Sequence, residues 1–175
     1  DTLKHPALEC LFTVDEETGL TGAFRLQDGC LNGKQLINLD SEDDGQVFIG
    51  CAGGIDTLAK MHYTPLTMPT EGQLAISLQV GGLMGGHSGD DINKGRGNAN
   101  KILVRFLYQV MNATDMQLAT ISGGNLRNAI AREAEAIITI PMAYKEDIRV
   151  MLNHYIATIE SEIGDVEKDF FMSLE

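Results

Sequence analysis

Residues 73–175 carry the pattern that most constrains the fold, because the spacing of their apolar residues alternates between strand-like and helix-like periods. Leu74, Ile76, Leu78 and Val80 alternate with small or polar residues, as in a half-buried strand. Apolar residues recur at helical spacing over 99–110 and 148–163, whereas 116–121, 134–140 and 166–174 are typical of strands. The order β-α-β-β-α-β predicts an antiparallel four-stranded sheet with two helices on one face, a ferredoxin-like arrangement.

The first 70 residues have a different rhythm. Short apolar runs at 7–14, 35–39 and 46–51 are typical of buried strands, and 20–26 favours a short helix that ends near Gly29. Strands that alternate with helices indicate an α/β sheet. Pro65, Pro69 and Gly72 mark a long turn or linker. We therefore predict an α/β (α+β) chain with one partial domain over 1–70 and a second domain over 71–175.

Composition excludes several classes of protein. The 175 residues carry a net charge of −12, which works against binding to the phosphate backbone of nucleic acids. No apolar run approaches the roughly 20 residues that cross a bilayer, and the first residues lack the basic and apolar regions of a signal peptide. Three cysteines at long spacings, without a CxxC pair, predict reduced thiols in a cytoplasmic protein.

Asp15, Glu16 and Glu17 form the sharpest local feature of the first 70 residues. Three adjacent carboxylates repel one another unless a cation compensates their charge. One interpretation is a solvated acidic loop, or a helix N-terminus that favours acids. The other is a metal site, in which one carboxylate binds the ion and its neighbour takes a proton from the attacking water.

Asp40 follows Glu17 by 23 positions and also comes directly after an apolar run. If the two runs were neighbouring strands, both carboxylates would lie on one rim of the sheet. Two acids do not complete a zinc site, which takes three or four protein ligands. None of the four histidines, at positions 5, 62, 87 and 154, stands at a fixed ligand spacing from these acids.

His87 lies within GGHSG, a loop whose glycines permit positive φ angles and close backbone approach. One interpretation is a tight connection that carries an incidental surface histidine. The other is a histidine that donates a hydrogen bond to a developing oxyanion. A phosphate-binding loop is disfavoured because neither GxGxxG nor GxxxxGK[ST] is present.

Two polar clusters flank the helical segments. Residues 94–100 precede the first helix, and Asn98 is a candidate N-cap. Residues 123–128 form a Gly- and Asn-rich turn between strands. In one interpretation these residues only form the turn. In the other, Arg127 or Asn128 donates a hydrogen bond to a substrate carboxylate or amide.

Five segments, taken together and in order, carry a family resemblance: TVDEETGLTGAF, LINLDSEDDG, GCAGGID, GGHSGDDINKGRGNANKIL and LRNAIAREA. Over nearly the whole chain they resemble the bacterial aminoacyl-histidine dipeptidases, which are zinc metallopeptidases of the M20 family. Ala131 departs from the pattern, since the family usually has proline there, and this change is expected to alter the local turn.

The resemblance implies a role for several residues. Glu16 corresponds to the general base, Glu17 to a ligand of one zinc ion and Asp40 to a ligand of the other. His87 corresponds to a lid histidine that reaches the active site, often across a dimer, and Asn128 to a lid asparagine that contacts substrate. The implied cofactor is two zinc ions, or other divalent metals such as manganese or cobalt.

The resemblance also implies ligands that this chain does not supply. Family members place two histidines and a bridging aspartate in contexts that no His or Asp occupies here. The chain therefore resembles an internal segment of a longer enzyme, namely part of a catalytic domain followed by a lid and dimerisation domain. The isolated polypeptide is expected to be inactive.

The sequence thus supports two hypotheses. In the leading one the parent is a cytoplasmic, homodimeric dizinc dipeptidase that hydrolyses aminoacyl-histidine dipeptides. In the alternative, residues 73–175 form a non-catalytic module for dimerisation or small-ligand binding, and the acidic loops are simply solvated.

Overall fold

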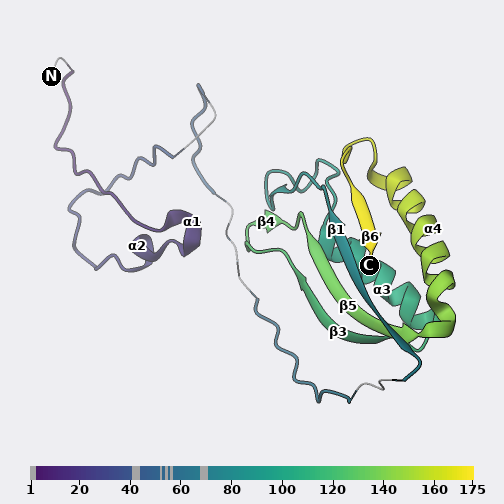
Figure 1. Cartoon of the computed structure of the whole chain (residues 1–175). Coiled ribbons are helices and arrows are strands. Elements are labelled where there is room, and N and C mark those ends of the chain that lie inside the picture. Colours follow the sequence, from purple (N-terminus) through teal and green to yellow (C-terminus); the bar gives the residue numbers. More distant parts are fainter. Residues whose placement is uncertain (1–2, 41–43, 52, 54, 56, 68–70) are drawn as a thin grey trace. The chain divides into compact units, whose positions relative to one another are not determined.

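The computed structural model divides the chain into two units, residues 1–61 and 62–175 (Figure 1). It describes residues 3–40, 44–51, 53, 55, 57–67 and 71–175. The proposed domain bounds at 70 and 71 stay a prediction, because residues 68–70 lie outside the described ranges. Residues 41–43, within the LINLDSEDDG segment, likewise lie outside the described ranges.

The second unit contains the predicted antiparallel sheet. Its four strands are β1 (Gln73–Gly81), β3 (Gln117–Gly123), β5 (Ala134–Pro141) and β6 (Phe171–Leu174), in the order β3-β5-β1-β6. Every neighbouring pair is antiparallel, and Leu78 of β1 pairs with both Ala136 and Leu174. This is the sheet order of the ferredoxin-like fold, so the predicted β-α-β-β-α-β order is confirmed.

Helices α3 (Ala99–Ala113) and α4 (Lys145–Ile163) cover the same face of this sheet (Figure 1). A short 3-10 turn, η1 (Met142–Tyr144), leads from β5 into α4. Apolar residues at i, i+3, i+4 and i+7 of α3 turn inward, and Phe106 is fully buried. The alternate residues of β1 and β5 complete the core, whose fully buried members include Leu78, Leu103, Phe106, Ile138 and Ile148.

The start of α3 is fixed from two sides. The Asn98 side chain accepts a hydrogen bond from the Lys101 N–H at 3.2 Å, so the predicted N-cap is confirmed. The Ala99 N–H, one of the donors that a helix leaves unpaired, donates to the carbonyl of Ala131 at 2.9 Å. Ala131 is itself buried, which joins the turn after residue 128 to the beginning of the helix.

Two short strands were not predicted. β2 (Gly86–His87) and β4 (Ala129–Ile130) pair as a separate two-stranded ladder in which His87 lies opposite Ala129. Strands of two residues have no measurable apolar period, so pattern analysis does not detect them. The last predicted strand, 166–174, is also too long, since β6 begins only at Phe171 and turns occupy most of the residues before it.

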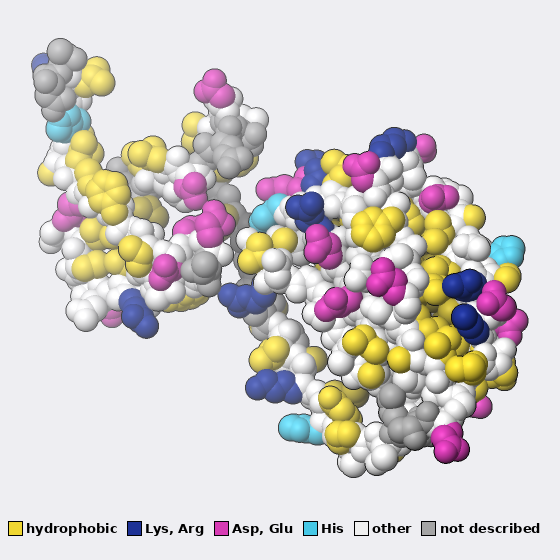
Figure 2. Space-filling model, viewed as in Figure 1, with side chains coloured by type: hydrophobic (Ala, Val, Ile, Leu, Met, Phe, Trp, Pro, Cys, Tyr) yellow, Lys and Arg dark blue, Asp and Glu magenta, His cyan; other side chains and the backbone are white. Residues whose placement is uncertain are grey.

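The first unit contradicts the strand predictions made for it. Its described residues form two four-residue helices, α1 (Glu16–Gly19) and α2 (Thr21–Phe24), and none of them belongs to a strand. The described residues of the runs 7–14, 35–39 and 46–51 lie in neither helices nor strands, and their side chains are exposed, as Phe12 (91%) and Ile49 (101%) illustrate. Figure 2 shows such hydrophobic side chains on the surface of this unit. An apolar run becomes a strand only where a second strand satisfies its backbone groups.

Candidate functional site

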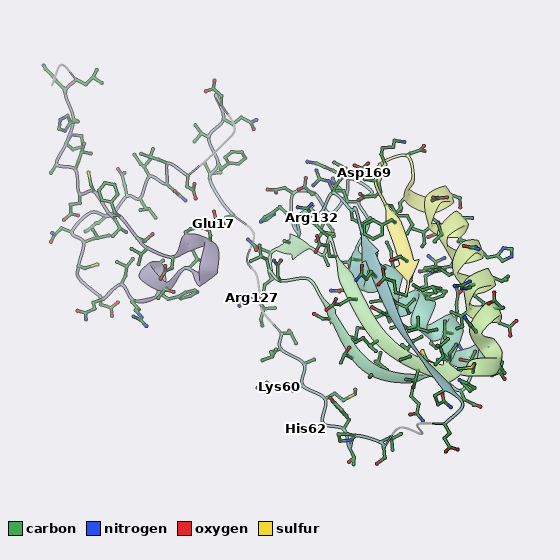
Figure 3. The ribbon with its side chains drawn as sticks, viewed as in Figure 1. Glu17, Lys60, His62, Arg127, Arg132 and Asp169 are labelled. Carbon is green, nitrogen blue, oxygen red and sulfur yellow. The ribbon has the colours of Figure 1, made fainter. Side chains whose placement is uncertain are left out.

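The predicted acidic motif lies in a tight turn of the first unit. Asp15 and Leu20, which flank α1, both have left-handed backbones with φ of 57° and 56°. The Gly22 N–H donates to the carbonyl of Val14 at 3.0 Å, and a Cβ on Gly22 would overlap the Val14 backbone. Left-handed conformations are unfavourable for residues other than glycine and occur preferentially at functional sites. The turn places Glu16 and Glu17 at the start of α1, and both carboxylates are exposed (Figure 3).

Asp40 lies in the same unit, outside any helix or strand, and is exposed. Its backbone N–H donates to the side-chain oxygen of Asn38 at 3.0 Å, a local turn that fixes the chain just before residue 41. Among the described residues no strand precedes either Glu17 or Asp40, so the expected rim of neighbouring strands is wrong in the form predicted.

A metal-binding cluster does not form among the residues that the structure describes. No group of three or more His, Cys, Asp or Glu side chains is close enough to hold an ion. Glu17 and Asp40 have the oxygen donors that divalent metals accept, but two carboxylates are fewer than the ligands of a complete site. The donor chemistry of the first unit therefore fits part of a metal site.

The two lid residues predicted from sequence are brought together. His87 and Asn128 are 41 positions apart, yet the Ser88 N–H donates to the carbonyl of Asn128 at 2.8 Å. The ladder between β2 and β4 holds the GGHSG loop beside the polar turn 123–128. Both side chains are exposed, and Arg127 lies next to them in the sequence, just before β4 (Figure 3).

The ring of His87 is held by its own loop. Its Nδ1 atom accepts hydrogen bonds from the backbone N–H groups of Gly89, at 3.1 Å, and Asp90, at 3.2 Å. The carboxylate of Asp90 lies 3.7 Å from the same nitrogen. A ring nitrogen that accepts hydrogen bonds carries no proton, so in the neutral ring the proton is on Nε2.

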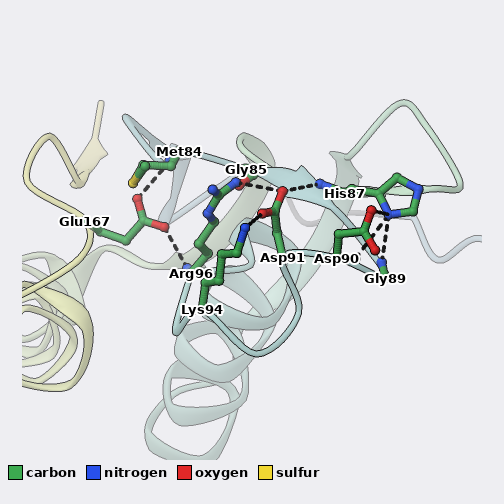
Figure 4. A network of polar contacts seen from close by, with 10 residues as sticks. Met84, Gly85, His87, Gly89, Asp90, Asp91, Lys94, Arg96 and Glu167 are labelled. Atoms are coloured by element: carbon green, nitrogen blue, oxygen red, sulfur yellow. Dashed lines mark hydrogen bonds and ion pairs between the residues drawn. The ribbon is translucent and has the colours of Figure 1, made fainter. Parts of the chain in front are cut away.

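Sequence analysis missed two carboxylates that organise this loop (Figure 4). Asp91 accepts hydrogen bonds from the His87 N–H at 2.8 Å and from Lys94 Nζ at 2.7 Å, and it pairs with Arg96 at 3.0 Å. The Lys94 hydrogen bond, followed by that of the His87 N–H, lowers the pKa of Asp91 from its ordinary value. The local signal was the run of Asp, Lys and Arg directly after GGHSG.

The second missed carboxylate is Glu167, which is only 3% exposed. Its two oxygens accept hydrogen bonds from the backbone N–H groups of Met84, at 2.8 Å, and Gly97, at 2.7 Å. These two residues stand at opposite ends of the glycine-rich loop, residues 84–97, so one buried side chain joins the two ends of the loop. Nothing in the sequence marks Glu167, because the contact spans 70 and 83 positions.

A cavity of about 710 Å³ lies beside the β2–β4 ladder in the second unit. Gly86, Ala129, Arg132 and Glu135 belong to its lining. The Arg132 Nε donates to the carbonyl of Leu83 at 3.3 Å, and the stem of the side chain packs where a Cβ on Gly85 would lie. A cavity with charged groups of both signs suits a ligand with polar ends.

The second unit matches a known family. Residues 78–167, just over half of the chain, match the M20 peptidase dimerisation domain. The chain belongs to this family. The match includes α3, α4, the strands β3 and β5, and the loop that carries His87.

Two relatives are similar over both units. The cytosol non-specific dipeptidase of Escherichia coli is 41% identical over all 175 residues, which make up 36% of its own length. The crystal structure of the aminoacylhistidine dipeptidase from Vibrio alginolyticus matches 93% of the chain and 33% of its own, at 41% identity and a TM-score of 0.73. The chain thus spans about a third of the length of these relatives, and the resemblance to M20 dipeptidases is confirmed.

No helix among the described residues is long and apolar enough to cross a membrane.

Proposed function

We propose that this chain is the segment of a dimeric M20 dipeptidase that supplies its catalytic acids and its lid. The observation that carries the proposal is the 41% identity to dipeptidases across both units, not only across the dimerisation domain. That span includes the Asp15–Glu17 turn, Asp40, the His87 loop and the turn at Asn128. The cytosolic location named for the E. coli relative supports a cytoplasmic enzyme.

In this proposal Glu17 and Asp40 each bind one of two divalent ions, zinc or else manganese or cobalt. When bound there, such ions would supply a lowered pKa of the attacking water and polarisation of the scissile carbonyl. Glu16 accepts the proton of the attacking water and later returns it to the leaving amine. Glu16 directly precedes the proposed ligand Glu17 in α1 and is exposed. Because consecutive residues of a helix point in different directions, Glu16 suits a base that does not itself bind metal.

The residues of the second unit are proposed to contact the substrate. His87 donates its Nε2–H to the oxyanion that develops on the substrate carbonyl. Asn128, held beside His87 by the β2–β4 ladder, and Arg127 donate to the amide or terminal carboxylate of a dipeptide. The mixed charges of Arg132 and Glu135 in the adjacent cavity suit a zwitterionic substrate of this kind.

The function is tested in a chimera in which this chain replaces the matching segment of the E. coli dipeptidase. We expect the chimera to hydrolyse dipeptides and Glu16→Gln to lower kcat by about 10²- to 10⁴-fold, while metal content measured by atomic emission stays unchanged. Loss of metal together with turnover would show that Glu16 is a ligand. A folded, metal-loaded chimera without activity contradicts the proposal.

The dimer is proposed to form through the β3 edge of the sheet and the outer face of α3. Val104, Tyr108 and Met111 stand at i, i+4 and i+7 of α3 and are 50–63% exposed. α3 contacts β3, whose Leu118 and Ile121 are about half exposed. β3 pairs only with β5, so its outer edge is open to a second copy of the chain.

Tyr108→Glu places a charge in the middle of this surface and is expected to convert the dimer into a monomer. Sedimentation equilibrium measures the change in mass. Tyr63→Glu is the matched control, because Tyr63 is also exposed but lies on the extended segment before β1. A dimer that both variants leave intact places the interface elsewhere. A chain that dimerises while its chimera shows no peptidase activity would favour the alternative of a non-catalytic module.

A further inference from the structure

The inference concerns which nitrogen of His87 faces the substrate. The two backbone N–H groups that point at Nδ1 belong to residues two and three positions further along the chain, Gly89 and Asp90. This geometry requires the loop to curl back over the ring. Because both donors aim at one nitrogen, the other nitrogen, Nε2, is left to carry the proton of the neutral ring and to donate it.

The curl depends on Asp91. Its side chain accepts the His87 N–H at 2.8 Å, and its own N–H donates to the carbonyl of His87 at 3.1 Å, so residues 87 and 91 are joined twice. Lys94 and Arg96 neutralise the carboxylate, whose side chain is only 15% exposed. The turn that contains Gly89 and Asp90 is therefore closed by one charged side chain.

The closed turn is anchored to the rest of the second unit. Arg96, the partner of Asp91, also donates to the carbonyl of Gly85 at 2.6 Å. Gly86 has φ of 138°, and a Cβ there would overlap both Arg96 and Asp91. Glu167 holds the two ends of the loop through Met84 and Gly97. Figure 4 shows the contacts of Glu167 beside those of Arg96 and Asp91, and the two sets meet where Met84 and Gly97 adjoin Gly85 and Arg96 in the chain.

We propose that Asp91 is the positioning residue of His87, and that the turn it closes fixes the neutral imidazole as the Nε2–H tautomer. Asp90 acts only through its backbone N–H, because its carboxylate is 91% exposed and too far from Nδ1 for a hydrogen bond. The consequence for catalysis rests on the proposed function, in which Nε2–H is the oxyanion donor. The tautomer itself does not depend on that proposal.

The experiment measures the chemical shifts of the histidine ring nitrogens by proton–nitrogen correlation NMR. The chain carries nitrogen-15-labelled histidine and is kept at a pH where the rings are neutral. His87→Gln assigns the signal among the four histidines. We expect an unprotonated Nδ1 in the unsubstituted chain, with the Gly89 and Asp90 amide protons protected from exchange. In Asp91→Ala the ring signals should shift to those of the exposed His154, and the protection should be lost. Asp91→Asn, which keeps an acceptor for the His87 N–H, should fall between.

Asp90→Asn is the matched control and should leave both signals as in the unsubstituted chain. An Nδ1–H ring in the unsubstituted chain overturns the proposal without any variant. An Asp91→Ala chain with unchanged core methyl signals and an unchanged His87 ring also overturns it. In the active chimera, Asp91→Ala should lower kcat with little change in KM. A shifted tautomer with full kcat contradicts the catalytic consequence, whereas an inactive chimera contradicts only the proposed function.

Discussion

The two units of the chain are stabilised in different ways. The second unit buries a continuous core between its sheet and two helices, with Phe106 and Leu78 fully enclosed. The first unit is linked by polar contacts, of which the clearest is the carboxylate of Glu9, which accepts hydrogen bonds from Asn32 and Gly33. No described residue of the first unit is buried, so the difference between the units lies in burial. The proposed chemistry is divided in the same way, with the acids on the first unit and the histidine on the second.

The largest expected effect is on the core of the second unit. Phe106→Ala removes a fully buried ring that lies 5.2 Å from the ring of Tyr155, centroid to centroid. We expect the free energy of unfolding of this unit to fall by about 3 to 5 kcal/mol, measured by urea denaturation. Phe12→Ala, at a 91% exposed position of the first unit, is the control and should leave that transition unchanged. Equal losses would mean that the two units share one core.

A smaller effect is expected at the base of the glycine-rich loop. Glu167→Ala leaves the N–H groups of Met84 and Gly97 without their acceptor and should cost the second unit about 2 to 3 kcal/mol in the same denaturation. Glu167→Gln keeps one acceptor oxygen and should cost less. If Glu167→Ala has no effect on stability or on the amide exchange of Gly97, the loop is not held in this way.

The smallest effect is a pH dependence confined to the first unit. The Asn32 side chain, followed by the backbone N–H groups of Gly33 and Asn32, lowers the pKa of Glu9 below its ordinary value. A lowered pKa contributes stability above the unfolded value of about 4.5, and this contribution is lost as the pH falls through the folded value. We expect the Asn32 and Gly33 amide signals to shift in acid, and Glu9→Gln to abolish that shift. Acid shifts that reached Phe106 equally would contradict independent units.

The sequence predicted most of the second unit because its elements are long and periodic. The alternation over 74–80 and the helical spacing over 99–110 each survive in β1 and α3. The same method failed over 7–14, where an apolar run has no strand partner among the described residues. A short apolar run predicts burial, and it forms a strand only if tertiary structure provides a neighbour.

The candidate site was predicted less completely than the fold. Glu16, Glu17, Asp40, His87, Asn128 and Arg127 were selected from motifs and resemblance, and their roles stay predictions. The proximity of His87 to Asn128 follows from a two-residue ladder that has no sequence period. Glu167 could not be selected from the sequence. Its role is visible only after folding brings the carboxylate to the two backbone N–H groups that donate hydrogen bonds to it.

The central claim is that residues of both units act in one active site, with His87 reaching it across the dimer. The most direct measurement is dipeptidase activity in a mixture of two chimeras, Glu16→Gln and His87→Gln, after their subunits have been exchanged. Each variant alone should be almost inactive. In a two-fold dimer, random exchange should restore about a quarter of the unsubstituted activity, because each mixed dimer has one complete site. A mixture as inactive as its components, despite demonstrated exchange, would contradict the account.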